Sequence, residues 1–198
     1  MAQRSLRDAL LNAAASEFHE KGYSATGVAG IAARAGAPKG SFYNHFPSKD
    51  DLGVLVVEAY ARSRRAEILM EPGADPIDAL RRHFTWLRDD LGGDEYTRGC
   101  LLGNFGGEVG RTGTKVDDAV RESFDQWFAA ITYAVRRAAE ENLLPEGTDP
   151  DAAARFLGSS WEGAVLLAKV TGSPAPVEDF LAIAFPRVLG HPFAVPPA

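Results

Sequence analysis

The chain has 198 residues, of which 45% are hydrophobic and 24% charged, and this composition is typical of a folded protein with one large or two small domains. It excludes intrinsic disorder, and the longest uninterrupted apolar run, residues 164–168, is far too short to cross a membrane. The single cysteine, Cys100, excludes an intramolecular disulfide, and the four histidines lack ligand spacing, so we expect no metal and no cofactor.

Charge is distributed unevenly along the chain. The net charge is −6, but residues 1–64 hold eight lysines and arginines against six aspartates and glutamates, which gives +2 there and leaves −8 for the remainder. A mildly basic N-terminal third is typical of a local nucleic-acid-binding module. No secretory apolar segment follows the N-terminus, so we expect a cytoplasmic protein with no membrane partner.

The first third of the sequence predicts three short helices. Apolar residues recur at helical spacing over about residues 4–20. Thr26 can cap a second helix that ends at Gly36, where a left-handed residue is favoured. Pro38 then starts a third helix, because proline loses no hydrogen bond at the first helical position. Two short helices joined by a tight, glycine-containing turn form a helix-turn-helix.

The rest of the chain predicts an all-α fold. Apolar stripes with helical period run over about residues 77–91, 116–135, 157–168 and 177–188, and no sustained period-two alternation appears. Phe46-Pro47 ends the third helix, and Ser48 caps the next. We therefore expect a helix-turn-helix DNA-binding domain, a connecting helix, a helical ligand-sensing and dimerisation domain and a loose tail, over residues 1–47, 48–71, 72–190 and 191–198.

The predicted third helix carries side chains suited to DNA. Lys39 offers a cation to phosphate, and Gly40 is a poor helix former whose use suggests a close approach of the backbone to a partner. Lys49 lies at a helix N-terminus, where phosphate is favoured. The alternative for Tyr43 and His45 is packing within the domain, which we favour for Phe42 and Phe46. The predicted DNA-binding residues are Thr26, Lys39, Gly40, Ser41, Tyr43, Asn44, His45 and Lys49.

Residues 27–52, GVAGIAARAGAPKGSFYNHFPSKDDL, resemble the signature of the TetR family of transcriptional regulators. The match covers the Ala-Gly turn, the Lys-Gly-Ser-Phe-Tyr segment and the Phe-Pro-Ser-Lys exit. The resemblance implies a homodimer that binds double-stranded operator DNA, represses nearby genes and releases the DNA on meeting a small molecule. A dimer reads two half-sites on one duplex, and we expect residues 150–170 and 176–190 to pair with their symmetry mates in a four-helix interface.

Cys100 is the candidate sensing residue of the C-terminal part. It lies among Gly99, Gly103 and Gly106, which lower helix propensity and suggest a helix thinned to admit neighbours or a ligand. The alternative is that a lone cysteine is a small buried hydrophobe. The Gly-Cys-Leu element resembles the N-ethylmaleimide-responsive, NemR-like branch of the TetR family, which implies a response to reactive electrophiles.

Lys169 interrupts an apolar face in a stretch that resembles the same branch. A lysine near a thiol raises its thiolate fraction, whereas the alternative is a surface lysine at a helix C-terminus. Asn104 and the aromatic rings are candidate pocket walls, although such rings belong more often to the core. The predicted ligand-binding or sensing residues are Cys100, Asn104, Phe105, Trp127, Trp161 and Lys169.

Two other functions stay open on the sequence alone. A cysteine-dependent enzyme would need a base near Cys100, and the nearby sequence offers no histidine, only Asn104 and Glu108. We therefore assign no catalytic residue and expect no enzyme. The second alternative is a helix-turn-helix that only mediates dimer contacts.

Overall fold

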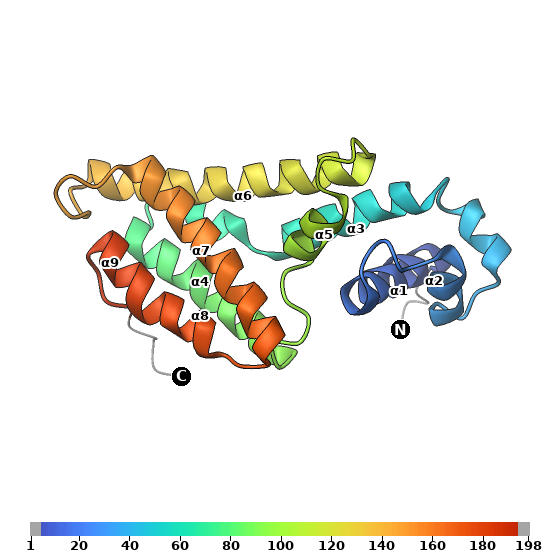
Figure 1. The fold of residues 1–198 in the computed structure, drawn as a ribbon. Helices are drawn as coiled ribbons and strands as arrows, with labels where there is room; N and C mark the ends of the chain where they lie inside the picture. The colour runs from blue at the N-terminus through green and yellow to red at the C-terminus, as the bar shows by residue number, and fades with distance from the viewer. Residues whose placement is uncertain (1–4, 194–198) are drawn as a thin grey trace. The chain divides into compact units, whose positions relative to one another are not determined.

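The computed structural model describes residues 5–193, which are helical with connecting loops and contain no strand in that range (Figure 1). The chain divides into two compact units. Unit 1 comprises Met1–Ser63 and Leu101–Phe124, and unit 2 comprises Arg64–Cys100 and Asp125–Ala198. This division differs from the consecutive domains that we expected, because residues 101–124 pack with the N-terminal helices instead of the C-terminal ones.

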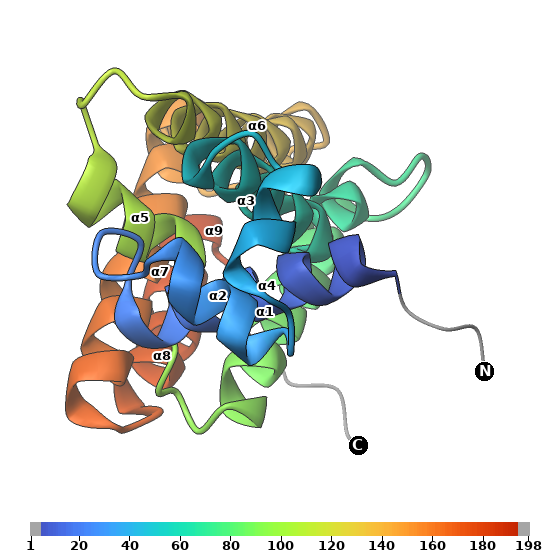
Figure 2. The same cartoon turned by 90° about the vertical axis from the view of Figure 1, so that its right-hand side faces the viewer.

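Unit 1 is built from short helices around aromatic side chains. Their bounds are α1 Leu6–Lys21, α2 Val28–Arg34, η1 Lys39–Asn44, α3 Lys49–Ser63, α5 Leu101–Val109 and the first part of α6 Lys115–Glu140. Contacts join α1 to α2, α3 and α5, and α2 to η1 (Figure 2). The ring of Phe105 in α5 lies 5.5 Å from that of Phe18 and 5.2 Å from that of Tyr23. These rings bury α5 against α1, which is why residues 101–124 belong to this unit.

The local signals of the helix-turn-helix are mostly confirmed. Gly36 adopts a φ of +69° after α2, the left-handed conformation that glycine adopts without strain. Ser48 caps α3, because its hydroxyl accepts the amide of Asp51 at 3.0 Å. The prediction for Pro38 is wrong by one position: it precedes η1 with ψ of 140°, and η1 is a six-residue 3₁₀-helix. The expected helix is therefore shorter and more tightly wound.

The predicted connecting helix over residues 48–71 ends earlier than expected. α3 stops at Ser63, and Arg65 takes a φ of +56°, which breaks the helical path. A separate 3₁₀-helix, η2, follows over Ala66–Met70 and contacts α4 within unit 2. A left-handed arginine is sterically unfavourable within a continuous helix, so the connection becomes two elements that belong to different units.

Unit 2 holds the longer helices and most of the apolar core. Its elements are η2, α4 Pro76–Gly93, the remainder of α6, α7 Pro150–Thr171, and the consecutive segments α8 Ala175–Asp179, η3 Phe180–Ala184 and α9 Phe185–Leu189. η3 is a π-helical stretch, and contacts join α7 to α8, η3 and α9 (Figure 1). These helices match the predicted apolar stripes, and the all-α fold class is confirmed.

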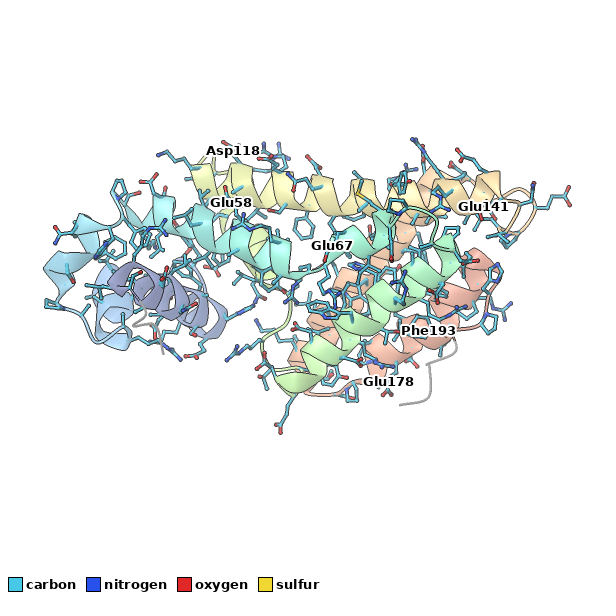
Figure 3. The ribbon with its side chains drawn as sticks, turned by 180° about the vertical axis from the view of Figure 1, so that it is seen from behind. Glu58, Glu67, Asp118, Glu141, Glu178 and Phe193 are labelled. Carbon is cyan, nitrogen blue, oxygen red and sulfur yellow. The ribbon has the colours of Figure 1, made fainter. Side chains whose placement is uncertain are left out.

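The expected loose tail begins inside the folded part of unit 2. His191 Nε2 lies 2.7 Å from the carbonyl oxygen of Leu143, and the Phe193 ring packs edge-on against Phe185 with centroids 4.9 Å apart (Figure 3). Residues 194–198 of the predicted tail lie outside the described residues. Within residues 5–193, no helix has the length and apolar character needed to cross a membrane.

Candidate DNA-binding surface and sensing site

Four of the predicted DNA-binding residues form an exposed surface on η1. Lys39, Gly40, Tyr43 and Asn44 are exposed, and the Tyr43 side chain keeps 57% of its surface open. A methyl group added at Gly40 would meet nothing within 4 Å, so the backbone there is open to a partner. A cation, a phenol and an amide on one bare segment can contact phosphates and base edges of DNA.

Buried aromatic side chains of η1 and of Phe46, which follows it, support this surface from beneath. Phe42 and Phe46 are completely or almost completely buried, as we predicted, and their centroids lie 5.6 Å apart. Tyr43 packs edge-on against Phe42, and the Arg7 guanidinium lies 5.3 Å from the centre of the Phe46 ring. Ser41 and His45 are only partly exposed, and the Ser41 hydroxyl donates to the carbonyl of Pro38. Packing within the domain therefore explains Ser41 and His45 better than it explains Tyr43.

Thr26 is a correction to the predicted DNA-binding set, whereas Lys49 is half-buried and its contact with DNA stays a prediction. Thr26 is buried, and its hydroxyl donates to the carbonyls of Glu17 and Gly22 instead of capping α2, whose N-cap is Gly27. The Lys49 ammonium donates to the carbonyls of Tyr23 and Thr26 at 3.1 and 3.2 Å. Both polar groups hold the turn between α1 and α2, and that of Thr26 is buried.

Glu17 is a structural residue of the helix-turn-helix that the sequence did not reveal. It is buried in α1, and its carboxylate accepts from Lys21 at 2.7 Å and from Arg34 of α2 at 2.9 Å. The hydrogen bond from Lys21, followed by that from Arg34, holds the pKa of Glu17 below its usual value. Arg34 also pairs with Glu20, so one guanidinium ties α2 to two acids of α1.

Glu108 joins α5 to the turn between α1 and α2. Its carboxylate accepts the backbone amides of Tyr23 at 3.0 Å and Ser24 at 2.7 Å. Gly22 passes so close, with a φ of +85°, that an added methyl group would lie 2.5 Å from the Glu108 carboxylate. Glu108 was a candidate base for Cys100, but its oxygens are engaged within unit 1.

Cys100 has a carboxyl partner in unit 2. The residue is half-buried immediately before α5, and its thiol donates a hydrogen bond to the side chain of Glu162 on α7. Glu162 has intermediate exposure as a residue, while its carboxyl group is withdrawn from water. This desolvation raises the pKa of Glu162 to about 7, and the thiol hydrogen bond lowers it only partly. Glu162 borders the apolar stripe that contains Trp161, but its pairing with Cys100 had no signal in the sequence.

The structure does not bring the whole predicted sensing set together. Phe105 is a correction: it is fully buried in unit 1 with Phe18 and Tyr23, and Asn104 lies on the same helix of that unit. Cys100, Trp127, Trp161 and Lys169 belong to unit 2.

Both tryptophans of the predicted sensing set belong to the core of unit 2. Trp127 donates from Nε1 to Nε2 of the buried His83 at 2.9 Å, and Trp161 packs on Phe84 with centroids 5.3 Å apart. Burial, and secondarily the Arg64 charge, lowers the pKa of His83 to about 4. Lys169 is half-buried in the last turn of α7, and its role beside the thiol stays a prediction.

Two family models match the chain. The model of bacterial regulatory proteins of the tetR family matches residues 10–53, and the tetracyclin repressor-like C-terminal domain matches residues 76–184. The HTH-type transcriptional repressor DhaR of Mycobacterium sp. (strain GP1) is 32% identical, over 96% of this chain and 95% of its own length.

Two solved structures share the fold over most of their length. The regulatory protein TetR from Rhodobacter sphaeroides superposes with a TM-score of 0.80 and 33% identity, over 91% of this chain and 96% of that one. The reduced form of Escherichia coli NemR gives a TM-score of 0.79 and 25% identity, over 96% and 100% of the two chains.

Proposed function

The chain belongs to the TetR family and is a DNA-binding transcriptional regulator, and from that premise we propose that it is a homodimeric cytoplasmic repressor released from its operator by an inducer acting at Cys100. The observation that carries the DNA-binding part is the bare η1 surface, where Lys39, Gly40 and Tyr43 are exposed above buried phenylalanines. The named relatives are regulators, and they favour this function over the alternative of a cysteine-dependent enzyme.

Lys39 and Tyr43 are the residues whose loss should weaken operator binding. We expect Lys39→Ala to lower affinity and reduce the slope of log K against log salt by about one, because one phosphate contact is lost. Tyr43→Phe should weaken binding without changing the fold, because only a hydroxyl is removed. Mobility-shift titrations on the intergenic DNA upstream of the gene measure both effects.

Arg65→Ala provides the matched control for Lys39→Ala. Arg65 is an exposed cation at the start of η2 in unit 2, outside both segments expected to pair in the dimer, so its loss changes net charge equally without touching the η1 surface. Its salt slope should equal that of the wild type. Wild-type affinity in both η1 variants would contradict the proposal, and a helix-turn-helix that only mediates dimer contacts would show no operator shift at all.

The dimer proposal rests on the outer face of α7. Phe156, Leu166, Leu167 and Val170 are each more than half exposed, while the opposite stripe of the same helix is buried. A helix that is apolar on both sides is normally covered on both sides. The exposed Ile183 of η3 continues the apolar surface onto the last helical segment. A second copy of the chain would cover these side chains and place two η1 surfaces on one duplex.

Leu166→Glu tests this interface. A charge in the centre of a buried apolar contact should shift the protein to a monomer at micromolar concentration and weaken operator binding. Met70→Glu is the matched control, because Met70 is equally exposed but lies on η2. Light scattering separates the outcomes: a wild-type monomer, or a dimer in the Leu166 variant, would contradict the proposed interface.

Cys100 is placed to couple an inducer to unit 1. The chain passes from unit 2 to unit 1 between Cys100 and Leu101, and the helix that begins there carries Phe105 and Glu108 to α1 and its following turn. A bulky adduct on a half-buried thiol exceeds the space of a packed protein, and packed regions answer added volume by shifting. Such a shift would be passed directly to the start of α5.

N-ethylmaleimide tests the sensing proposal, because the chain has one cysteine and therefore one thiol adduct. We expect treated wild type to lose operator affinity and treated Cys100→Ser to keep it. An equal response of the two proteins would show that Cys100 is not the sensor. The inducer would then be a reversible ligand of unit 2.

A further inference from the structure

Arg7 is an exposed cation at the edge of the η1 surface. It lies in the first turn of α1, and its guanidinium stands 5.3 Å from the centre of the Phe46 ring, just after η1. The Phe46 ring is almost completely buried, so the exposed Arg7 forms part of its cover. Arg7 is thereby held beside the segment that carries Lys39 and Tyr43, although it precedes the helix-turn-helix in the sequence.

The charge of Arg7 is not balanced by a carboxylate within residues 5–193. Its guanidinium forms no ion pair in that range, and the neighbouring Asp8 carboxylate accepts the Ser5 hydroxyl at 2.8 Å. A cation in the first turn of a helix also faces the positive end of the helix dipole, which is unfavourable. The fold of unit 1 therefore offers this charge only the contact with the ring, which is weak at an exposed site.

Arg64 of unit 2 shows what a stacked guanidinium with a structural role looks like. It lies 4.9 Å from the centre of the Trp86 ring, and it also binds the Asp90 carboxylate at 2.6 Å. Arg7 has the ring contact without such a carboxylate among the described residues. Its N–H donors are therefore available to an anion from outside the chain.

η1 keeps Arg7 apart from Lys39. Lys39 is the first residue of η1, whereas Phe46, over which Arg7 lies, comes after its last residue. A 3₁₀-helix rises about 2 Å per residue, so the six residues of η1 extend over about 12 Å. Phosphates follow one another at about 3.4 Å along the axis of each DNA strand. Cations at the two ends of η1 therefore meet different phosphates.

We propose that Arg7 binds a second phosphate of the operator, distinct from the one that Lys39 contacts, and that the Phe46 ring holds its guanidinium in position. The inference rests on the proposed role of η1 in operator binding, and it adds a contact from outside the helix-turn-helix. A guanidinium binds phosphate through two parallel N–H donors. Stacking on the ring restricts the side chain before DNA arrives, so less conformational entropy is lost on binding.

Salt-dependent mobility shifts on the intergenic DNA test the charge of Arg7. Arg7→Ala in the full-length protein should weaken binding and reduce the slope of log K against log salt by about one for each phosphate contact that is lost. The double variant with Lys39→Ala should lose the sum of the two slopes, because the contacts are separate. Arg7→Lys keeps the charge and should keep the wild-type slope, with weaker binding because lysine lacks the planar fork.

Arg62→Ala is the matched control within unit 1. Arg62 is an exposed cation near the end of α3, about 20 Å along that helix from Lys49. Its loss changes the net charge as Arg7→Ala does, but the salt slope should equal that of the wild type.

Single methylphosphonates placed along both strands of the same DNA identify the phosphate. Neutralising the phosphate that Arg7 binds should weaken wild type and leave Arg7→Ala unaffected, whereas Lys39→Ala should stay sensitive to it. A wild-type slope in Arg7→Ala would overturn the proposal, even if urea unfolding showed a loss of stability, because Arg7 would then only cover Phe46. Loss of sensitivity to one and the same phosphate in both variants would also overturn it. If Lys39→Ala bound like wild type, the proposed role of η1 would fail, and the slope of Arg7→Ala would still decide whether Arg7 binds phosphate.

Discussion

The two units treat their buried acids in opposite ways. In unit 1, Glu17 is buried between the cations of Lys21 and Arg34, and its pKa is lowered. In unit 2, the carboxyl of Glu162 has a thiol as its partner, and desolvation raises its pKa to about 7. The same side chain is therefore a permanent anion in one unit and changes its charge near neutral pH in the other.

The difference in pKa separates a carboxylate that only positions helices, Glu17, from a carboxyl group whose charge can respond to its surroundings, Glu162. A charge that is satisfied by two cations holds α1 and α2 in one arrangement and does not change with conditions inside a cell. A carboxyl group without a cation costs stability when it is ionised, so small changes around it shift its charge and its reactivity. His83 resembles Glu162, because it is fully buried in unit 2 and its Nε2 accepts a hydrogen bond from the uncharged indole of Trp127.

Acid should destabilise the protein through His83. Its folded pKa of about 4 lies below the ordinary value of 6.5, so the stability contributed by the neutral ring is present above pH 6.5 and is lost as the pH falls through 4. The shift corresponds to about 3 kcal/mol. His83→Gln keeps an acceptor for Trp127 but removes the titration. Urea unfolding at pH 7 and pH 4 should show a loss larger in wild type by that amount, and equal losses would refute this assignment.

Glu162 should destabilise the protein at alkaline pH. Its folded pKa lies above the ordinary value of 4.5, so its contribution is present below pH 4.5 and is lost as the pH rises through about 7. Glu162→Gln should therefore raise the free energy of unfolding at pH 8 by about 2 kcal/mol, allowing for partial exposure, with no gain at pH 4.5. Urea titrations at the two pH values measure the difference, with Glu146→Gln as the exposed control. A gain in the free energy of unfolding that does not depend on pH would contradict the raised pKa of Glu162.

Glu17 should behave in the opposite sense. Its folded pKa is lowered, so its contribution is present above pH 4.5 and is lost in acid. Glu17→Gln should lower the free energy of unfolding at pH 7 by about 1 kcal/mol, because Lys21 and Arg34 are partly exposed and only part of the pairing energy is realised. Glu58→Gln removes an acid from an exposed pair with Arg62 and should change little. The expected signs at pH 7 are thus a loss for Glu17→Gln and a gain for Glu162→Gln.

Local signals predicted the fold better than they predicted the sites. The turn at Gly36, the Ser48 cap and the buried rings of Phe42 and Phe46 depend on neighbours a few residues away, and all are confirmed. The error at Thr26 was also local in origin, since a threonine before a helix is a normal cap. Its hydroxyl instead binds the Glu17 carbonyl nine residues earlier, a partner that only the packed α1 supplies.

The acids that matter most have partners far along the chain. Glu108 binds amides 85 and 84 residues away, and Glu162 meets Cys100 on another segment of unit 2. No periodicity or motif encodes such pairs, because they depend on how helices pack. The resemblance to the TetR family predicted the fold and regulatory function. The roles of Cys100 and Lys169 stay predictions, and Phe105 belongs to the core of unit 1 instead of a sensing site.

Loss of the Glu108 carboxylate should have a milder effect, confined to the turn between α1 and α2 in unit 1. Its carboxylate accepts two backbone amides, those of Tyr23 and Ser24, at the turn that precedes α2. Glu108→Gln leaves one acceptor oxygen and turns an amide group towards the second N–H, so one bond is lost. Because Glu108 is exposed and water can replace the lost acceptor oxygen, the free energy of unfolding should fall by less than about 1 kcal/mol. Local opening should change more clearly than global stability: hydrogen exchange at the amides of residues 23 and 24 should be several-fold faster, while the amides in the middle of α1 keep their rates. With Glu58→Gln as the control in the same unit, unchanged exchange at both amides would mean that α5 does not hold this turn.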